Sequence, residues 1–430
     1  MKAPALSLAV ALLLAASPAL ERQAEAPAAP RVVVGQVAAA IRDAYFDPAK
    51  AETIAAALEA EAAQGRYDSL TDPRDLETAL TARLEPWDQH FNVGRPAPST
   101  PAAPSATSSS SLAPVPFPVV AARGGQGFRA VEILPGNVGL IDMRFFADFD
   151  GADDPARKQV DAALQLISGA DAVIIDLRNN GGGSPAMVGY LVSAFVGPDA
   201  DVYNRFHSRE GEDTEAPAQP YAAPRVDVPV YVLISARTGS AAEAFAYTMQ
   251  AAKRAVIVGE TSGGAANPGG PVFTPSGYRV FISTGSPTNP LTGGNWEKVG
   301  VRPDVAVPAE DALETAWKAA LAGQSGAAPA AATEAAWVRE ALDAPVLSVD
   351  PAPYLGAYGG SVVQATEDGL TWRNERRPAW RLRPLSPDLF FDVDEPYRRI
   401  RFMRDAAGRV TALEVLDSQT GISRLLRRSA

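Results

Sequence analysis

Strands and helices alternate along the middle of this 430-residue chain, and the alternation restricts the folds that it can adopt. Short apolar runs typical of buried strands are followed by longer segments whose apolar residues recur at helical spacing. Such an order predicts an α/β core in which helices pack on a sheet. The expected strands cover residues 138–143, 172–177, 230–235, 256–259 and 278–284, and the expected helices cover 155–167, 185–196 and 240–252.

Segments of different composition flank this core and divide the chain. Helical spacing predicts a small helical domain over 31–94, and strand and turn signals predict a compact antiparallel β domain over 341–430. A stretch dominated by Pro, Ser, Thr and Ala predicts a linker over 95–115, because such residues bury too little apolar surface to fold. An alanine-rich stretch of low complexity predicts a second linker over 322–340. The α/β core then occupies residues 116–321.

The first 19 residues are typical of a secretory signal peptide. Lys2 precedes an apolar run over 5–16 that is too short to span a bilayer, and the sequence Ser17-Pro18-Ala19 suits signal peptidase. The chain has no Cys, so it needs no disulfides and offers no cysteine for a lipid anchor. We therefore expect a periplasmic or secreted protein without a membrane anchor.

Ser240 stands at the junction of an expected strand and an expected helix. The run Ser240-Ala241-Ala242-Glu243 matches a capping box, in which the serine and glutamate bond each other's backbone amides at the helix start. A serine in this position is also where a nucleophile gains from nearby backbone donors, such as the N–H of Ala241. Both interpretations of Ser240 stay open on this motif alone.

Three glycines, Gly181 to Gly183, follow the apolar strand over 172–177 and lead into a helix. Glycine lets backbone N–H groups approach a phosphate or an oxyanion without interference from a Cβ atom. The pattern Gly181-x-Gly183-x-x-Ala186 also matches a dinucleotide fingerprint, although Pro185 removes one donor. A glycine turn that only reverses the chain is the third interpretation.

The net charge and the two histidines restrict the partners and the catalytic groups that this chain can use. Lys and Arg number 39 against 50 Asp and Glu, and the net charge of -11 argues against a nucleic-acid partner. The two histidines, His90 and His207, lie far apart in sequence, and no cluster of His, Asp or Glu has metal-ligand spacing. We therefore predict no metal and no cofactor, and a serine nucleophile with an imidazole base must use one of these two histidines.

Taken in order, these motifs resemble the peptidase core of the C-terminal processing (tail-specific) serine proteases. The resemblance covers residues 31–320 and rests on the strand and glycine turn over 173–183, the Ser240 junction, Val258-Gly259-Glu260-Thr261 and Gly300-Val301-Arg302-Pro303-Asp304. Within the family, the chain is similar to the branch of interphotoreceptor retinoid-binding-protein-like proteins and the tricorn core. The resemblance implies a core with crotonase-like ββα character.

The chain departs from the family pattern at the position of the general base. Processing proteases of this family use a Ser/Lys dyad, and alignment on Gly259-Glu260 places Ala265 at the lysine position. The tricorn-like branch uses a histidine and a glutamate, and His90 and Glu297 occupy those positions. The resemblance thus implies Ser240 as nucleophile, His90 as general base and Glu297 as its carboxylate. It also implies oxyanion donors at Gly182 and Ala241.

The expected function is therefore that of an exported serine peptidase that cleaves polypeptides through an acyl-enzyme on Ser240. The alternative is a non-catalytic binding protein for retinoid-like or fatty-acyl ligands on the same fold, because sites are grafted on folds. A nucleotide-dependent enzyme is the third hypothesis. His207 matches no position of the family and is predicted to lie in a loop, and the sequence does not specify an oligomeric state.

Overall fold

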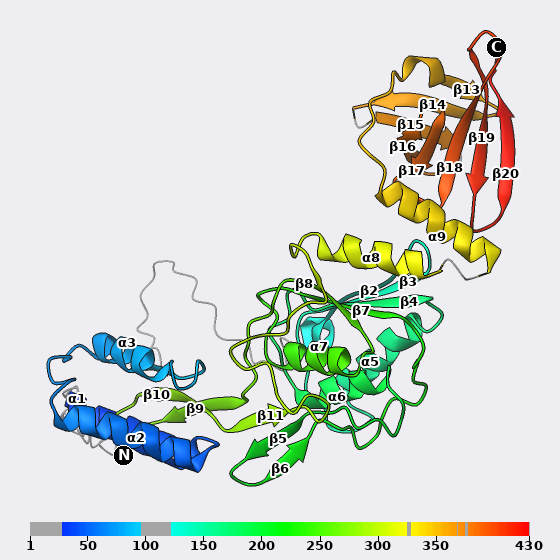
Figure 1. Ribbon diagram of the computed structural model, residues 1–430. Coiled ribbons are helices and arrows are strands. Elements are labelled where there is room, and N and C mark those ends of the chain that lie inside the picture. The colour runs from blue at the N-terminus through cyan, green and yellow to red at the C-terminus, as the bar shows by residue number, and fades with distance from the viewer. Residues whose placement is uncertain (1–27, 96–121, 325–327, 368, 375–376, 430) are drawn as a thin grey trace, which may run out of the picture.

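The computed structural model describes residues 28–95, 122–324, 328–367, 369–374 and 377–429 (Figure 1). The predicted signal peptide over 1–19 lies outside these residues, as does the predicted linker over 95–115 except for residue 95. None of the helices in the described part is long and apolar enough to cross a membrane.

The centre of the molecule is a mixed sheet with the strand order β12-β8-β7-β4-β3-β2, in which β2 runs antiparallel to β3 and the other neighbours are parallel. Alternate residues of the inner strands pack on opposite faces, which explains their continuously apolar sequences. The strands are β2 (Phe128–Leu134), β3 (Val138–Met143), β4 (Ala172–Asp176), β7 (Val230–Ile234), β8 (Val256–Gly259) and β12 (Val305–Ala306).

Helices cover both faces of this sheet. One face packs against α5 (Pro155–Leu166), α6 (Pro185–Ser193) and α7 (Ala241–Ala251), and the other against α8 (Ala312–Gly323). Because β4 and β7 are neighbouring parallel strands, the loops that follow them lie at the same edge of the sheet. That edge carries both the glycine turn and Ser240.

The N-terminal domain consists of α1 (Pro30–Ala44), α2 (Pro48–Ala63) and α3 (Pro73–Leu84), as the sequence predicts. Asp47 and Asp72 cap α2 and α3, and each is followed by a proline at the first helical position.

A hairpin from the distant α/β segment completes this domain. Strand β10 (Arg279–Ser283) pairs with β9 (Gly269–Phe273) on one side and with β1 (Asn92–Gly94) on the other. Val280 and Ile282 are buried among the helices. The strand that we assigned to the core therefore belongs to the N-terminal domain, as Figure 1 shows.

A smaller sheet in the order β11-β5-β6 lies beside the core. It is formed by β5 (Arg205–Ser208), β6 (Glu212–Thr214) and β11 (Gly285–Thr288). His207 lies on β5 and not in a loop, and its Nδ1 is 3.1 Å from Glu212 Oε2 on the neighbouring strand. The pair is exposed, which is typical of a surface hairpin.

The predicted linker over 322–340 is wrong for most of its length, because α9 (Pro329–Leu342) occupies it. Alanine has the highest helix propensity, and Ala335, Val338 and Ala341 recur at helical spacing and are buried. The alanine-rich sequence thus forms a packed helix between α8 and the C-terminal domain.

The C-terminal domain is an antiparallel meander, as predicted, and its strands are β13 (Gly356–Tyr358), β14 (Ser361–Thr366), β15 (Gly369–Asn374), β16 (Trp380–Ser386), β17 (Leu389–Asp392), β18 (Arg398–Arg404), β19 (Val410–Asp417) and β20 (Ile422–Arg427). Its first and last strands meet, because the Ser429 N–H donates to the Ala357 carbonyl at 2.8 Å. The domain encloses a separate apolar core.

Candidate active site

Ser240 occupies a sharp turn between β7 and α7. Its backbone angles are φ 50° and ψ -121°, a left-handed conformation that costs a non-glycine residue about 1–3 kcal/mol. The Ser240 N–H donates to Glu243 Oε2 at 2.8 Å, so the glutamate bond of the predicted capping box is present. The side chain of Ser240 lies at the surface. A strained, exposed serine at a strand-to-helix turn is the geometry of a nucleophile elbow.

The glycine turn after β4 lies directly against Ser240. A Cβ atom added to Gly182, whose φ is 119°, would lie 2.7 Å from Ser240 Cβ, so a side chain at this position is excluded. The Gly239 N–H donates to the Asn180 carbonyl at 3.1 Å and holds the two turns together.

The two predicted oxyanion donors differ in their backbone contacts. The Gly182 N–H donates to Asn180 Oδ1 at 2.9 Å, because the short, buried Asn180 side chain folds back over the turn. Gly182 is therefore not a free donor in this structure. The Ala241 N–H meets no acceptor among the described residues. Of the predicted pair, only the Ala241 N–H is available to an oxyanion in the described structure.

Glu243 is a fully buried carboxylate that organises the loop opposite Ser240. Besides the Ser240 N–H, it accepts hydrogen bonds from Ser262 Oγ at 2.6 Å, from the Gly264 N–H at 2.6 Å and from the Ala265 N–H at 2.9 Å. The sequence predicted a residue of the helix start, and the structure adds this role. Several donors satisfy the buried charge and fix the loop relative to the serine.

His90 reaches the core because of the strand that follows it. Strand β1 begins at Asn92, which pairs with Phe281 on the hairpin strand β10, and the His90 ring lies 6.2 Å from the Phe281 ring. Gln89 Nε2 also donates to the Gly264 carbonyl, on the loop that Glu243 holds. A short series of contacts, Gln89 to Gly264 to Glu243, thus links the histidine segment to the backbone of Ser240.

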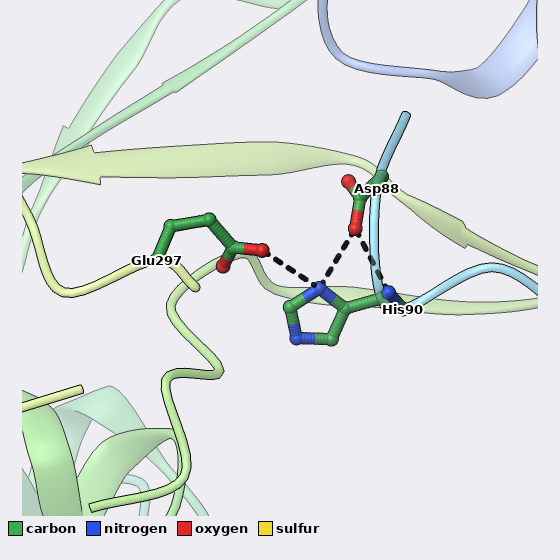
Figure 2. A group of neighbouring side chains, drawn as sticks. All are labelled: Asp88, His90 and Glu297. Carbon is green, nitrogen blue, oxygen red and sulfur yellow. Dashed lines mark hydrogen bonds and ion pairs between the residues drawn. The ribbon is translucent and has the colours of Figure 1, made fainter. Parts of the chain in front are cut away.

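Two carboxylates face the same ring nitrogen of His90, as Figure 2 shows. Asp88 Oδ1 lies 2.9 Å from Nδ1 and also accepts the His90 backbone N–H at 2.9 Å. Glu297 Oε1 lies 3.5 Å from Nδ1, and Glu297 Oε2 accepts the Ala266 N–H at 2.9 Å. The second ring nitrogen, Nε2, points away from both carboxylates (Figure 2). Asp88 is therefore the direct hydrogen-bond partner of His90, in the place where the sequence predicted Glu297.

The charges of this group follow from burial and contact. Burial opposes ionisation of Asp88, but the hydrogen bonds from His90 outweigh it and hold the pKa of Asp88 below its usual range. Burial raises the pKa of Glu297. Burial also opposes protonation of His90, but the hydrogen bond to Asp88 and the charge of Glu297 raise its pKa overall. An ionised Asp88 favours the tautomer with the proton on Nδ1, which leaves a lone pair on Nε2.

The contact of Asp88 with His90 and the convergence of three potential metal ligands were not predicted from the sequence. Asp88 stands two residues before His90, and a short aspartate that bonds the backbone two residues on is a recognisable local signal. Potential ligand atoms of Asp88, His90 and Glu297 all lie within 4.8 Å of one another, although no such spacing is visible in sequence. The fold creates this group by bringing Glu297 to a turn 207 residues earlier (297 minus 90).

The α/β core has the fold of a peptidase of the S41 type. Residues 137–307, from β3 to the loop after β12, match the model of peptidase family S41. The chain therefore contains a peptidase family S41 domain, and the resemblance to the C-terminal processing proteases is confirmed over this segment. The assignment to the tricorn-like branch stays a prediction.

Three proteins to which the chain is similar are each named as proteases. A carboxyl-terminal-processing protease of Picosynechococcus sp. is 30% identical over 142 residues, which is 33% of this chain and 33% of the relative. The chain thus matches about a third of the length of this curated relative. The photosystem II D1 C-terminal processing protease is 25% identical over 40% of this chain and 43% of that chain, with a TM-score of 0.33. The tricorn protease is 16% identical over 46% of this chain and 17% of that chain, with a TM-score of 0.29.

Proposed function

We propose that this protein is an exported serine peptidase that hydrolyses polypeptides through an acyl-enzyme on Ser240. The observation that carries the proposal is the strained turn of Ser240, which presents the serine beside a backbone N–H without an acceptor, that of Ala241. A capping role alone does not require a left-handed serine, since N-cap residues usually adopt extended angles. Strain of this kind gathers at functional sites.

The proposed chemistry assigns a role to each group. His90 Nε2 takes the proton of Ser240 as the hydroxyl attacks the peptide carbonyl, and later gives it to the leaving amine. Asp88 holds the Nδ1 proton and stabilises the imidazolium, and Glu297 adds a second negative charge at 3.5 Å. The Ala241 N–H stabilises the oxyanion. A second donor from the glycine turn requires the Gly182 N–H to leave Asn180.

A fluorophosphonate probe, which phosphonylates activated serines with loss of fluoride, tests this proposal. We expect stoichiometric labelling of the wild-type chain, and no labelling of Ser240→Ala. Ser184→Ala is the matched control, because Ser184 also stands at a helix start but caps α6 by accepting the Ala186 N–H at 3.2 Å. Labelling that survives Ser240→Ala, or an absence of labelling in folded wild-type protein, overturns the mechanism. Saturable fatty-acid binding without labelling would instead favour the binding-protein alternative.

A further inference from the structure

Two carboxylates converge on Nδ1 of His90, which is one more than this nitrogen can satisfy. Nδ1 carries a single proton, and Asp88 Oδ1 lies close enough at 2.9 Å to receive it. Glu297 Oε1 is 3.5 Å from the same nitrogen, and it is buried with no hydrogen-bond partner among the described residues. A buried carboxylate oxygen without a donor is energetically costly. The group therefore has one acceptor more than its donors can fill.

Among the described residues, no lysine or arginine forms an ion pair with these carboxylates. Within the described part of the chain, His90 is the sole ion-pair partner of Asp88 and of Glu297. Lys50 reaches the Tyr45 hydroxyl at 3.1 Å and the Trp87 carbonyl at 2.9 Å. Lys298 is next to Glu297 in sequence, but its Nζ donates to the Pro86 carbonyl. Asp88 and Glu297 therefore share at most one positive charge, that of His90 when its imidazole is protonated.

The distances and the donor types suit a metal ion. Ligand atoms around a tetrahedral zinc ion lie about 3.3 Å apart, because the metal–ligand bonds are about 2.0–2.1 Å long. The observed separations from Nδ1, 2.9 Å to Asp88 and 3.5 Å to Glu297, fall on either side of this value. An imidazole nitrogen with two carboxylate oxygens is a set that zinc, iron and manganese accept, whereas magnesium and calcium prefer oxygen alone.

The outer oxygens of both carboxylates are already held by the protein. Glu297 Oε2 accepts the backbone N–H groups of Ala266 at 2.9 Å and Asn267 at 3.2 Å. Asp88 Oδ2 accepts the Tyr45 hydroxyl at 3.2 Å and Asn267 Nδ2 at 3.4 Å. Bonds of this kind orient ligating carboxylates and are a regular part of metal sites. The inner oxygens, Asp88 Oδ1 and Glu297 Oε1, are left facing Nδ1.

We propose that Asp88, His90 and Glu297 bind one divalent transition-metal ion of the zinc type, and that the bound ion reversibly switches off the peptidase. Binding itself depends only on the three side chains. The inhibitory effect rests on the proposed function of His90 as the base for Ser240.

Inhibition follows from the tautomers of imidazole. A neutral imidazole has one N–H and one lone pair, and a metal on Nδ1 uses the lone pair of that nitrogen. The ring proton must then lie on Nε2. With a proton on Nε2, His90 has no lone pair to accept the hydroxyl proton of Ser240, and the first step of acylation is blocked.

Calorimetric titration with Zn²⁺ of the full chain, freed of metal with EDTA, tests the site without reference to activity. We expect one Zn²⁺ per chain, the same binding in Ser240→Ala, and loss of binding in His90→Ala. Glu297→Gln should weaken affinity at least tenfold, and thermal unfolding verifies that each variant is folded. The matched control is His207→Ala, which removes the other histidine of the chain and its exposed pair with Glu212. Binding that persists in His90→Ala but disappears in His207→Ala overturns the site.

A second measurement separates the two parts of the proposal. If the wild-type chain is an active peptidase, Zn²⁺ should inhibit it, and inhibition should be half-maximal at a free Zn²⁺ concentration equal to the Kd from calorimetry. EDTA should restore the activity, and Mg²⁺ should have no effect. Stoichiometric binding at His90 in a chain without peptidase activity would leave the metal site standing and remove the proposed function. Activity without binding, or binding at His90 without inhibition, would overturn the metal switch and leave the peptidase intact.

Discussion

At the scale of single residues, Ser240 combines a proposed chemical role with backbone strain. Its φ of 50° lies in a region that glycine enters without cost and that other residues avoid. The serine side chain is retained there at the expense of stability, which is typical of residues kept for chemistry. The two contributions can be separated, because two different substitutions remove the hydroxyl group.

Ser240→Gly and Ser240→Ala should therefore differ in stability while sharing the loss of activity. We expect Ser240→Gly to unfold with a free energy about 1 kcal/mol greater than that of Ser240→Ala, since only glycine relieves the strain. Denaturant unfolding measures the difference, and the peptidase assay verifies that both variants are inactive. Equal stabilities would contradict the strained turn.

Asp88 and Glu297 should contribute unequally to catalysis. In Asp88→Asn the amide cannot accept the Nδ1 proton as a carboxylate does, and we expect kcat to fall by roughly 10³ to 10⁴. Glu297→Gln leaves the 2.9 Å contact between Asp88 and His90 in place, and we expect a fall of less than about tenfold. Comparison of kcat in metal-free buffer measures both. A larger loss in Glu297→Gln would restore the sequence-based assignment.

At the scale of structural elements, the glycine turn and the Ser240 turn fit only because Gly182 lacks a side chain. In Gly182→Ala the new Cβ would lie 2.7 Å from Ser240 Cβ, at a φ of 119° that alanine avoids. We expect activity to fall at least a hundredfold and the midpoint of thermal unfolding to decrease. Gly181→Ala is the control, because a Cβ there meets nothing within 4 Å. Similar losses in both variants would contradict this packing.

Close to α7, a buried acid makes stability depend on pH. Glu215, next to β6, is only 4% exposed, and burial raises its pKa to about 8 despite hydrogen bonds from Asn204. The unfolded chain ionises this group from about pH 4.5, whereas the folded chain keeps it neutral, so folding loses stability as pH rises through this window towards 8. Glu215→Gln should raise the thermal midpoint more at pH 8 than at pH 4. Glu210→Gln, an exposed neighbour, should change neither.

The limits of regular elements were largely predictable, because periodicity is a local signal. The strands expected at 138–143 and 256–259 have the same limits as β3 and β8. Periodicity could not reveal that 278–284 pairs with residues near 93, because nothing local specifies a partner so far along the chain. Nor did composition distinguish a linker from α9, since alanine is frequent in both.

The residues proposed for the site could be named from the sequence, but their contacts could not. Ser240, His90 and Glu297 come from a family pattern that specifies positions, and the structure brings His90 and Glu297 to 3.5 Å. The choice of Asp88 as the direct partner depends on a 0.6 Å difference between two distances (3.5 minus 2.9) that only the fold determines. The bond between Gly182 and Asn180 likewise depends on one side-chain conformation.

At the scale of the whole molecule, the N-terminal domain and the α/β core share one hairpin. The strand β10 supplies Val280 and Ile282 to the apolar core of the helical domain, and it pairs with the strand that follows His90. The Arg209 guanidinium adds hydrogen bonds from the core to the carbonyls of Tyr45 at 2.7 Å and Arg42 at 2.6 Å. A substitution that weakens this interface should therefore also displace His90, the proposed base.

Ile282→Ala and Leu413→Ala test this coupling. Both side chains are fully buried, and each truncation should cost about 2–5 kcal/mol of unfolding free energy. Ile282 lies on the shared hairpin, so we expect a fall in kcat at a temperature at which the variant is folded. Leu413 lies in the separate core of the C-terminal domain, and kcat should not change. Equal kcat values in the two variants would show that the hairpin does not position His90.

The shared hairpin also determines when, during synthesis, the proposed active site can form. Domains usually fold as they emerge during synthesis, with the N-terminal one first. Here the first domain lacks part of its apolar core until residue 283 has been made, and Glu297 follows later still. A nascent chain that already carries Ser240 should therefore have no positioned base. We therefore expect the protein not to cleave itself or its neighbours until its α/β core has been almost fully synthesised.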